Sequence, residues 1–383
     1  MKRTLFVFGL VAGCVFAATR PMSVDVFTSG SEGYHTFRIP AIVTAQDGTL
    51  LVFAEGRKEN RSDPGGGDID LVFKRSRDQG ASWSALMVLD DPGLGWAASN
   101  PTPVLDRRTG RLWVFYNRWA PGRGTASSRP GAYDNQAWAR SSDDHGATWS
   151  EAVDLTHVAR DIEHWGAMFF GPGGAIQTRD GRLIVPAAMR PDSFDFFLSI
   201  GGFTGRTSLM RAYVLYSDDG GVSWRRGALL RAQTDENQLV ELADGAILMD
   251  ARQGAGEHRW LAFSDDGGAT WSDPVPGQSV TPISAAIERY SYEGEAEPSR
   301  ILWTGPAGPG RRRLVVRLSY DEGQTFSVER LLYGGLAAYS DLTVLNDRSI
   351  GVVWERGVSQ PYQFLTFTRF GIDFLEAGVV GSR

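Results

Sequence analysis

The chain has 383 residues, of which 42% are hydrophobic, 11% aromatic and 22% charged, so it can bury a sizeable core and is not a disordered chain. Its formal net charge of −6 argues against a protein that binds nucleic acid by neutralising phosphates. The single cysteine, Cys14, excludes an internal disulfide and a zinc site made of several cysteines.

The first 17 residues have the outline of a signal peptide. Two basic residues, Lys2 and Arg3, precede an apolar run that ends at Ala17. A membrane-spanning helix needs about 20 apolar residues, and this run is shorter. We therefore expect export to the periplasm, the cell surface or the medium, and no membrane span. Residues 11–14, Val-Ala-Gly-Cys, also resemble a bacterial lipoprotein processing site, and a lipid anchor on Cys14 is the alternative to simple secretion.

Two repeats interleave through residues 18–383. The first has the pattern Ser-x-Asp-x-Gly-x-Thr-Trp with small variations, and its copies begin at residues 76, 142, 217, 264 and 319. This is the chemistry of a hairpin turn, in which the aspartate caps its own turn, the glycine adopts a positive φ and the aromatic residue packs underneath. Each copy has only one or two carboxylates, whereas a calcium loop needs about six oxygen ligands. We therefore interpret the repeat as structural.

The second repeat is an apolar strand, a turn containing Asp or Gly, and another apolar strand. Its copies span residues 39–54, 103–116, 174–187, 239–250 and 342–354, with a looser copy at 284–303. Short strands with regular turn signals and no helical periodicity predict an all-β fold. Four strands repeated six times predict a single six-bladed β-propeller of four-stranded antiparallel blades, filling residues 18–383.

This topology sorts the side chains by face. Both kinds of turn lie at one end of each blade, so the start of the first strand and the end of the second strand lie at the opposite end. The polar residues expected at that opposite end are Arg38, Arg57, Asp63, Glu236, Arg252, Arg311, Arg312, Arg313, Tyr339, Asp341, Glu355 and Arg356. Any one of them could be a solvated rim residue or half of an ordinary ion pair. Together, arginines from several blades suit a ligand with a carboxylate, which guanidinium groups bind through forked hydrogen bonds.

Several motifs occur in one order along the chain: Phe-Arg-Ile-Pro at 37–40, the five Asp-containing turns, Glu-Asn-Gln-Leu-Val-Glu-Leu at 236–242, Asp-Ala-Arg at 250–252 and Tyr-Ser-Asp at 339–341. In this order they resemble the bacterial exo-α-sialidases (neuraminidases), whose five turns are called Asp boxes. The resemblance covers essentially the whole chain after the signal peptide. An Asp box alone is a weak signal, because many binding proteins carry it.

The resemblance implies a role for individual residues. It makes Arg38, Arg252 and Arg311 the triad that binds the substrate carboxylate, with the adjacent Arg312 as the alternative third member. It makes Tyr339 the nucleophile, Glu236 its paired base and Asp63 the acid/base. It also makes Arg57 a contact to the sugar ring substituents and Glu355 the acid that orients Arg38. Asp68 and Asp70 follow in the same connection and are alternatives to Asp63. No metal or cofactor is implied.

The resemblance also implies a mechanism, and the negative charge of the substrate gives a physical reason for it. Sialidases with a tyrosine nucleophile are an exception among glycosidases, most of which use two carboxylates. A neutral tyrosine avoids the repulsion that an anionic nucleophile would meet from the substrate's own carboxylate, and a nearby base can take its proton. We expect hydrolysis of sialylated glycans with retention. The alternatives are a non-catalytic Asp-box propeller that binds glycans or proteins, an enzyme that prefers deaminated sialic acid, and an intramolecular trans-sialidase.

Overall fold

Strands make up nearly all the regular structure of this protein. The computed structural model describes residues 21–191, 197–200, 203–206, 210–254, 256–294 and 297–377. These residues form 26 strands and two short helices, α1 (Thr156–Ala159) and α2 (Ile372–Glu376), which confirms the all-β prediction. No helix in this part of the chain has the length and apolar character to span a bilayer. The expected signal peptide and Cys14 lie outside the described residues.

The first large sheet has the order β2-β3-β4-β6-β7-β8-β9, with β5 added to β4. Its strands are β2 (Thr36–Thr44), β3 (Leu50–Arg57), β4 (Ile69–Ser76), β5 (Met87–Asp90), β6 (Ala97–Asp106), β7 (Arg111–Trp119), β8 (Asn135–Ser142) and β9 (Val153–Asp154). Neighbouring strands are antiparallel except β4 and β6, which meet through a single parallel pair, Ile69 and Ala97.

Two smaller antiparallel sheets and a hairpin follow. The first sheet contains β10 (Trp165–Phe170), β11 (Ile176–Gln177), β12 (Leu183–Pro191), β15 (Arg211–Ser217) and β16 (Arg225–Arg226), and the separate hairpin contains β13 (Phe197–Ile200) and β14 (Phe203–Arg206). The second sheet contains β17 (Thr234–Glu241), β18 (Ile247–Gln253), β19 (His258–Ser264) and β20 (Val275–Ser279).

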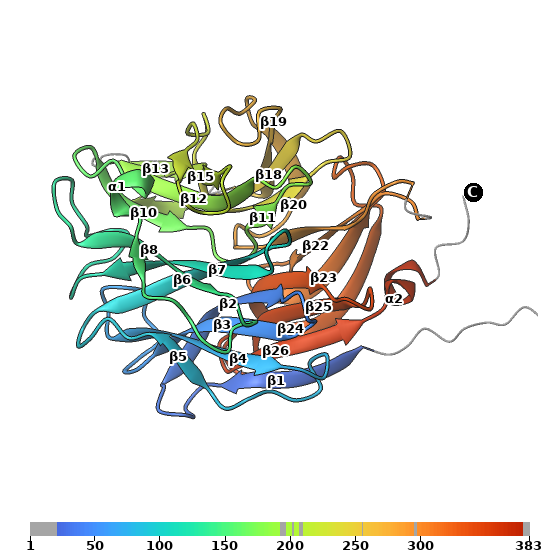
Figure 1. Ribbon diagram of the computed structural model, residues 1–383, viewed down its shortest axis with the longest axis horizontal. Coiled ribbons are helices and arrows are strands. Elements are labelled where there is room, and N and C mark those ends of the chain that lie inside the picture. The colour runs from blue at the N-terminus through green and yellow to red at the C-terminus, as the bar shows by residue number, and fades with distance from the viewer. Residues whose placement is uncertain are drawn as a thin grey trace, which may run out of the picture.

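The last sheet joins the two ends of the chain. Its order is β1-β26-β25-β24-β23-β22-β21, from β1 (Met22–Thr28), β21 (Ala286–Ser291), β22 (Arg300–Pro306), β23 (Arg312–Ser319), β24 (Val328–Val344), β25 (Ile350–Gly357) and β26 (Phe364–Phe370). The N-terminal strand pairs antiparallel with β26, and Figure 1 shows the blue and red ends of the chain side by side. The 17-residue β24 pairs with β23 through its first half and with β25 through its second. Tyr339 therefore lies inside a strand, whereas the sequence placed it before one.

The Asp-box turns have the predicted chemistry. In the fourth copy the Asp266 carboxylate accepts hydrogen bonds from the Thr270 amide at 2.8 Å and the Thr270 hydroxyl at 2.6 Å. Gly268 has φ +92°, and a Cβ there would lie 2.8 Å from Val214. The equivalent bonds recur in the other four turns. In the first copy, the Ser82 hydroxyl and amide lower the pKa of Asp78 to about 2.

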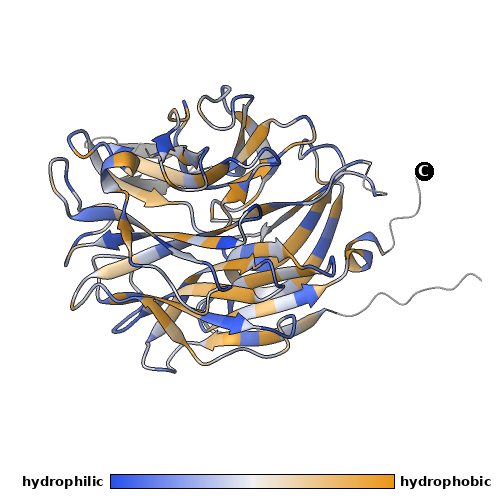
Figure 2. Cartoon of the chain, in the orientation of Figure 1, coloured by the Kyte–Doolittle hydropathy of each residue, from blue (hydrophilic) through white to orange (hydrophobic). Residues whose placement is uncertain are grey.

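The aromatic residue that ends an Asp box joins neighbouring sheet segments. Trp149 lies edge-on to Phe53 and Phe73, with ring centroids 6.0 and 5.8 Å away, although it follows β8 and they belong to β3 and β4. Trp83 packs on Phe367 of β26 in the same way, at 5.4 Å. Such pairs add to the burial of apolar surface, and Figure 2 shows hydrophobic residues along many of the strands. The polar residues described next lie at the opposite ends of these strands.

Candidate active site

A strained bulge aims Arg38 into a pocket at the start of β2. The pairing of β2 with β3 shifts between Arg38 and Ala41, and Ile39 has φ +56°. A β-branched residue rarely adopts this conformation, so the surrounding structure must hold it. The Ile39 amide donates a hydrogen bond to Glu355 Oε1 at 3.0 Å, and Glu355 is completely buried. The Phe-Arg-Ile-Pro motif is therefore a bulge that redirects a side chain.

The same device occurs in β6, where sequence analysis did not predict it. The pairing of β6 shifts between Ser99 and Thr102, Asn100 has φ +56°, and its amide donates to Glu55 Oε1 at 3.1 Å. Glu55 is buried in β3 and pairs with Arg57 at 2.6 Å, as Glu355 pairs with Arg38 at 3.1 Å. Two buried glutamates thus each hold one bulge and one arginine.

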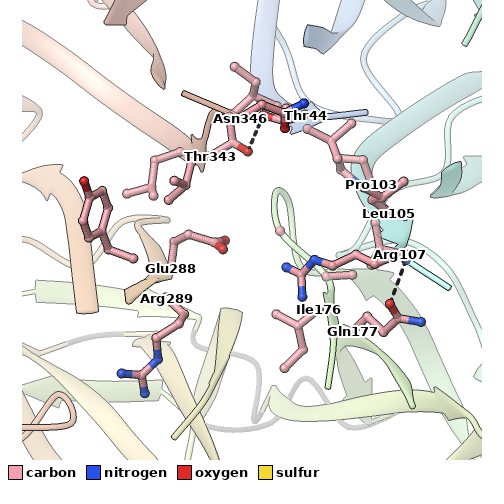
Figure 3. A pocket seen from close by; sticks show the side chains of 18 of the residues that line it. Thr44, Pro103, Leu105, Arg107, Ile176, Gln177, Glu288, Arg289, Thr343 and Asn346 are labelled. Atoms are coloured by element: carbon pink, nitrogen blue, oxygen red, sulfur yellow. Dashed lines mark hydrogen bonds between the residues drawn. The ribbon is translucent and has the colours of Figure 1, made fainter. Parts of the chain in front are cut away.

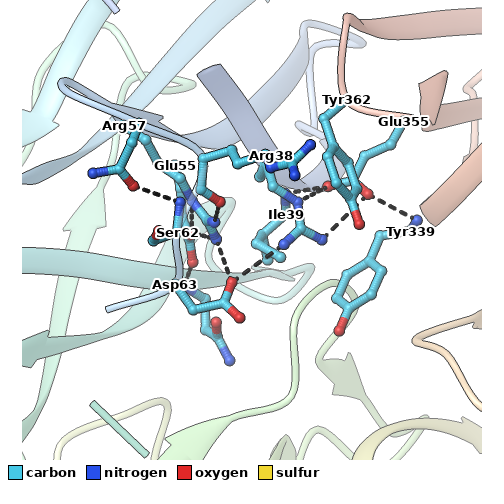
Figure 4. A network of polar contacts seen from close by, with 12 residues as sticks. Arg38, Ile39, Glu55, Arg57, Ser62, Asp63, Tyr339, Glu355 and Tyr362 are labelled. Carbon is cyan, nitrogen blue, oxygen red and sulfur yellow. Dashed lines mark hydrogen bonds and ion pairs between the residues drawn. The ribbon is translucent and has the colours of Figure 1, made fainter. Parts of the chain in front are cut away.

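Asp63 lies between these two arginines. It belongs to the exposed loop after β3, and its Oδ1 atom lies 2.9 Å from Arg57 Nη2 and 3.2 Å from Arg38 Nη1 (Figure 4). Desolvation in the pocket would raise the pKa of Asp63, but Arg57 and Arg38 outweigh it and hold that pKa below its usual range. Asp63 is therefore ionised in this structure.

Tyr339, Glu236 and Arg252 form a second cluster in contact with the first. The Tyr339 hydroxyl donates to Glu236 Oε1 at 2.5 Å, and Arg252 Nη1 lies 3.0 Å from that hydroxyl and 2.6 Å from Glu236 Oε2. Burial and the Glu236 carboxylate raise the pKa of Tyr339 well above its ordinary value. The phenol is therefore neutral, with an acceptor already placed for its proton.

Three arginines surround the Tyr339 ring. Besides Arg252, the Cζ atoms of Arg38 and Arg311 lie 5.2 and 5.4 Å from its centroid. Arg312, the alternative third member, is exposed and does not line the pocket. We call the cavity of about 270 Å³ lined by Arg38, Arg57, Asp63, Glu236, Arg252, Arg311 and Tyr339 the front pocket. It brings together every residue that the resemblance placed at the site, with Glu355 beneath Arg38.

Three other carboxylates from the sequence analysis lie elsewhere. Asp68 and Asp70 gather with Asp91 around Lys58, whose Nζ is within 3.7 Å of all three, so neither competes with Asp63 for the front pocket. Asp341 was expected on the same face, and this is wrong. It is buried in the second half of β24, where it accepts hydrogen bonds from the Ile42 amide at 2.8 Å and Gln238 Nε2 at 3.0 Å.

Asp235 lines the front pocket and Tyr362 contacts two of its arginines, and the sequence analysis selected neither. Asp235 lies beside Glu236, 3.7 Å from Arg252 Nε, and burial raises the pKa of Asp235 to about 6. Tyr362 stacks on Arg38, 4.2 Å from Cζ to the ring centroid, and accepts a hydrogen bond from Arg311 at 2.7 Å. The only sequence signal for Asp235 was its adjacency to Glu236, and no sequence signal marked Tyr362.

Comparison with known proteins identifies the family of this chain. A profile described as a BNR repeat-like domain matches residues 48–352. The mouse protein sialidase-3 is 32% identical, in an alignment that covers 91% of this chain and 94% of that protein. The chain belongs to the sialidase family. A sialidase from Micromonospora viridifaciens is 31% identical over 88% of this chain, which spans only about half of that longer protein, 52%.

The fold of this sialidase-family chain is also shared with a solved structure. The Hadza microbial sialidase Hz136 superimposes with a TM-score of 0.82 at 24% identity, covering 92% of this chain and 69% of that one. The comparisons therefore confirm the resemblance to sialidases that the ordered motifs, from Phe-Arg-Ile-Pro to the late tyrosine, indicated.

Proposed function

We propose that this protein is an exo-α-sialidase that hydrolyses terminal sialic acid from glycoconjugates with retention of configuration, using Tyr339 as the nucleophile. The observation that carries the proposal is the gathering of Arg38, Arg252 and Arg311 around a neutral phenol that is hydrogen-bonded to Glu236. An anionic sugar would bind the arginines and present its anomeric carbon to that phenol.

The arginine cradle supports the choice of substrate class. Glu355 neutralises Arg38, and Glu236 and Asp235 neutralise Arg252, so the three cations can lie close together without a ligand. A carboxylate entering the front pocket would gain charge-assisted hydrogen bonds from preorganised guanidinium groups. A neutral sugar would offer these arginines only hydroxyl acceptors, which lack the charge and the paired oxygens of a carboxylate.

The chemical step uses the contacts around Tyr339. Its oxygen forms a bond to the anomeric carbon as the glycosidic bond breaks, and its proton passes to Glu236, 2.5 Å away. Asp63 donates a proton to the departing oxygen. In the second step Asp63 takes a proton from water, the water oxygen bonds to the anomeric carbon, and Tyr339 leaves and recovers its proton from Glu236. Two inversions give net retention.

Substrate binding can prepare Asp63 for its role as an acid. In the free protein, Arg57 and Arg38 hold the pKa of Asp63 low. A substrate carboxylate on Arg38 would take one of these partners away and add a negative charge nearby, so the pKa of Asp63 would rise. The proton donor then forms only in the occupied pocket.

The six-bladed propeller belongs to the same proposal. The eight-stranded sheet can be divided at the single β4–β6 pair, and the seven-stranded sheet at the middle of β24. Each half then has four strands, which gives four units. With the sheets around β12 and β18 the total is six. Export by residues 1–17, with or without lipid on Cys14, also remains a proposal, and mass analysis of the mature N-terminus tests it.

Proton NMR of a sialyllactose digest tests the reaction. We expect α-N-acetylneuraminic acid to appear first and to equilibrate with the β-anomer. The β-anomer appearing first would contradict retention, and an anhydro sugar would identify an intramolecular trans-sialidase. Release from deaminated substrates alone would identify the alternative specificity, and no release from any sialoside would leave a binding propeller.

A further inference from the structure

A second cavity lies at the opposite end of the same central strands. Thr44 stands six residues after Arg38 on β2, which places them about 20 Å apart along the strand. Thr44 and Thr343 line a cavity of about 250 Å³, which also meets the ends of β6 and β11 and the strand β21 (Figure 3). We call it the rear cavity. Asp341 separates it from the front pocket along β24.

Two charged groups face one another across the rear cavity. Figure 3 shows the guanidinium of Arg107 and the carboxylate of Glu288 pointing into it from opposite walls. Within the described residues, neither group has a hydrogen bond or an ion pair. The Arg107 backbone amide donates a hydrogen bond to Gln177 Oε1 at 2.7 Å, while its guanidinium has no partner of either kind in the described part of the chain.

The other arginines of this cavity are already engaged. Arg289 pairs with Glu322 at 2.5 Å and donates to the Glu241 carbonyl at 2.8 Å. Arg348 pairs with Glu297 at 3.2 Å and stacks on Tyr290, 4.3 Å from Cζ to the ring centroid. Arg107 is thus the arginine of this wall whose guanidinium is unoccupied among the described residues.

The charge state of Glu288 reflects its isolation. Burial raises the pKa of Glu288 to about 7, although Arg107 and Arg289 lower it, and Asp341 raises it further. Arg107 is therefore near enough to act on this pKa, although no ion pair joins the two groups among the described residues.

We propose that the rear cavity binds a small organic acid that also carries a hydroxyl or ammonium group, with its carboxylate on Arg107 and its donor on Glu288. A guanidinium fork matches a carboxylate, and a half-buried carboxyl can accept from a hydroxyl or an ammonium. Sugar acids and amino acids both have this chemistry. The proposal does not depend on the reaction proposed for the front pocket.

Saturation-transfer NMR on the full-length protein tests the site, with gluconate and glycine as the two probes. We expect at least one probe to bind, and Arg107→Gln to weaken that binding about 10-fold or more, because a charge-assisted contact is lost. Arg348→Gln is the matched control, since it removes the same charge from the same cavity at an engaged residue. Arg107→Gln should leave sialoside hydrolysis unchanged.

The results separate the outcomes clearly. Binding that both variants weaken equally would overturn the site in favour of a general electrostatic effect. Binding unchanged by Arg107→Gln, or no binding of either probe, would also overturn it. The pH dependence identifies the source: glycine should bind less well as Glu288 is protonated below about pH 7, whereas gluconate should bind as well or better. The charged groups facing Glu288 in this titration are Arg107, Arg289 and Asp341.

Discussion

The front pocket and the rear cavity share the strands β2, β6 and β24 but differ in how their charged groups are paired. In the front pocket, Arg38 already has Glu355 and Asp63 as partners, and Arg252 has Glu236. In the rear cavity, the charges of Arg107 and Glu288 face one another without contact among the described residues. The charges of the front pocket are therefore paired before a ligand arrives. Those of the rear cavity become paired only when a ligand bridges Arg107 and Glu288.

This difference in charge pairing follows from the proposed functions of the two sites, which are catalysis in the front pocket and binding in the rear cavity. Leaving one buried charge unpaired costs about 3–5 kcal/mol, so three arginines around one ring require buried acids beside them. That same pairing fixes their positions before the substrate enters, which is how electrostatic catalysis works. In the rear cavity Arg107 is exposed, so water can solvate its guanidinium while no ligand is bound.

Replacing the acid/base should have a large effect on the front pocket. We expect Asp63→Asn to lower kcat/KM for sialyllactose about 10²–10⁴-fold, because the departing sugar oxygen needs a proton. For an aryl sialoside, whose phenolate leaving group is stable without a proton, the rate of the first step should fall far less. Steady-state and burst kinetics on both substrates check this. An equal loss of bond cleavage on both would show that Asp63 does not protonate the leaving group.

Replacing one arginine at each end compares the two ends directly. Arg38→Lys keeps the charge but loses the fork and the stacking on Tyr362, so we expect about a 10²-fold loss of kcat/KM. Arg107→Lys is the matched change in the rear cavity and should leave hydrolysis unaltered. If both variants lost activity alike, the separation of the two ends would be wrong.

The unpaired state of Glu288 should be visible in stability. Its folded pKa of about 7 lies above the ordinary 4.5, so the folded chain holds this proton more tightly. This favours folding below about pH 4.5 and is lost as the pH rises through 7. Glu288→Gln should therefore raise the free energy of unfolding by about 2 kcal/mol at pH 8, after discounting for partial exposure, and by much less at pH 5.

Urea denaturation of wild type and variant at both pH values measures that difference. A gain that is the same at pH 5 and pH 8 would mean that Glu288 does not titrate between them. A loss of stability at pH 8 would mean that it forms an ion pair with Arg107 after all.

The smallest effect concerns the Asp boxes, which lie away from the front pocket. Asp266→Ala removes the hydrogen bonds from Thr270 and should lower the free energy of unfolding by about 1 kcal/mol, with kcat unchanged. Asp265→Ala is the control, since the neighbouring Asp265 makes no such hydrogen bonds to the residues that the structure describes. Equal effects in denaturation would contradict the capping role of Asp266.

Local chemistry explains why so much of this arrangement was predictable. Each Asp box closes within seven or eight residues, so its bonds follow from spacing alone, and the family's ordered motifs marked Arg38, Arg252 and Tyr339. The remaining features depend on contacts between distant segments. Tyr362 reaches Arg38 and Arg311 from a loop with no motif, and the run of β24 through Tyr339 depends on pairing with two different strands. The opposition of Arg107 and Glu288 arises only when distant segments of the chain meet around the rear cavity.

The most direct test of the central claim is covalent trapping of the nucleophile. The protein is incubated with 2,3-difluorosialic acid, digested and analysed by peptide mass spectrometry, with Tyr339→Phe as the control. The proposed reaction predicts a sialyl adduct on Tyr339 and none in the variant, which should also lose turnover. An adduct on Glu236 or Asp63, or full turnover by Tyr339→Phe, would contradict it.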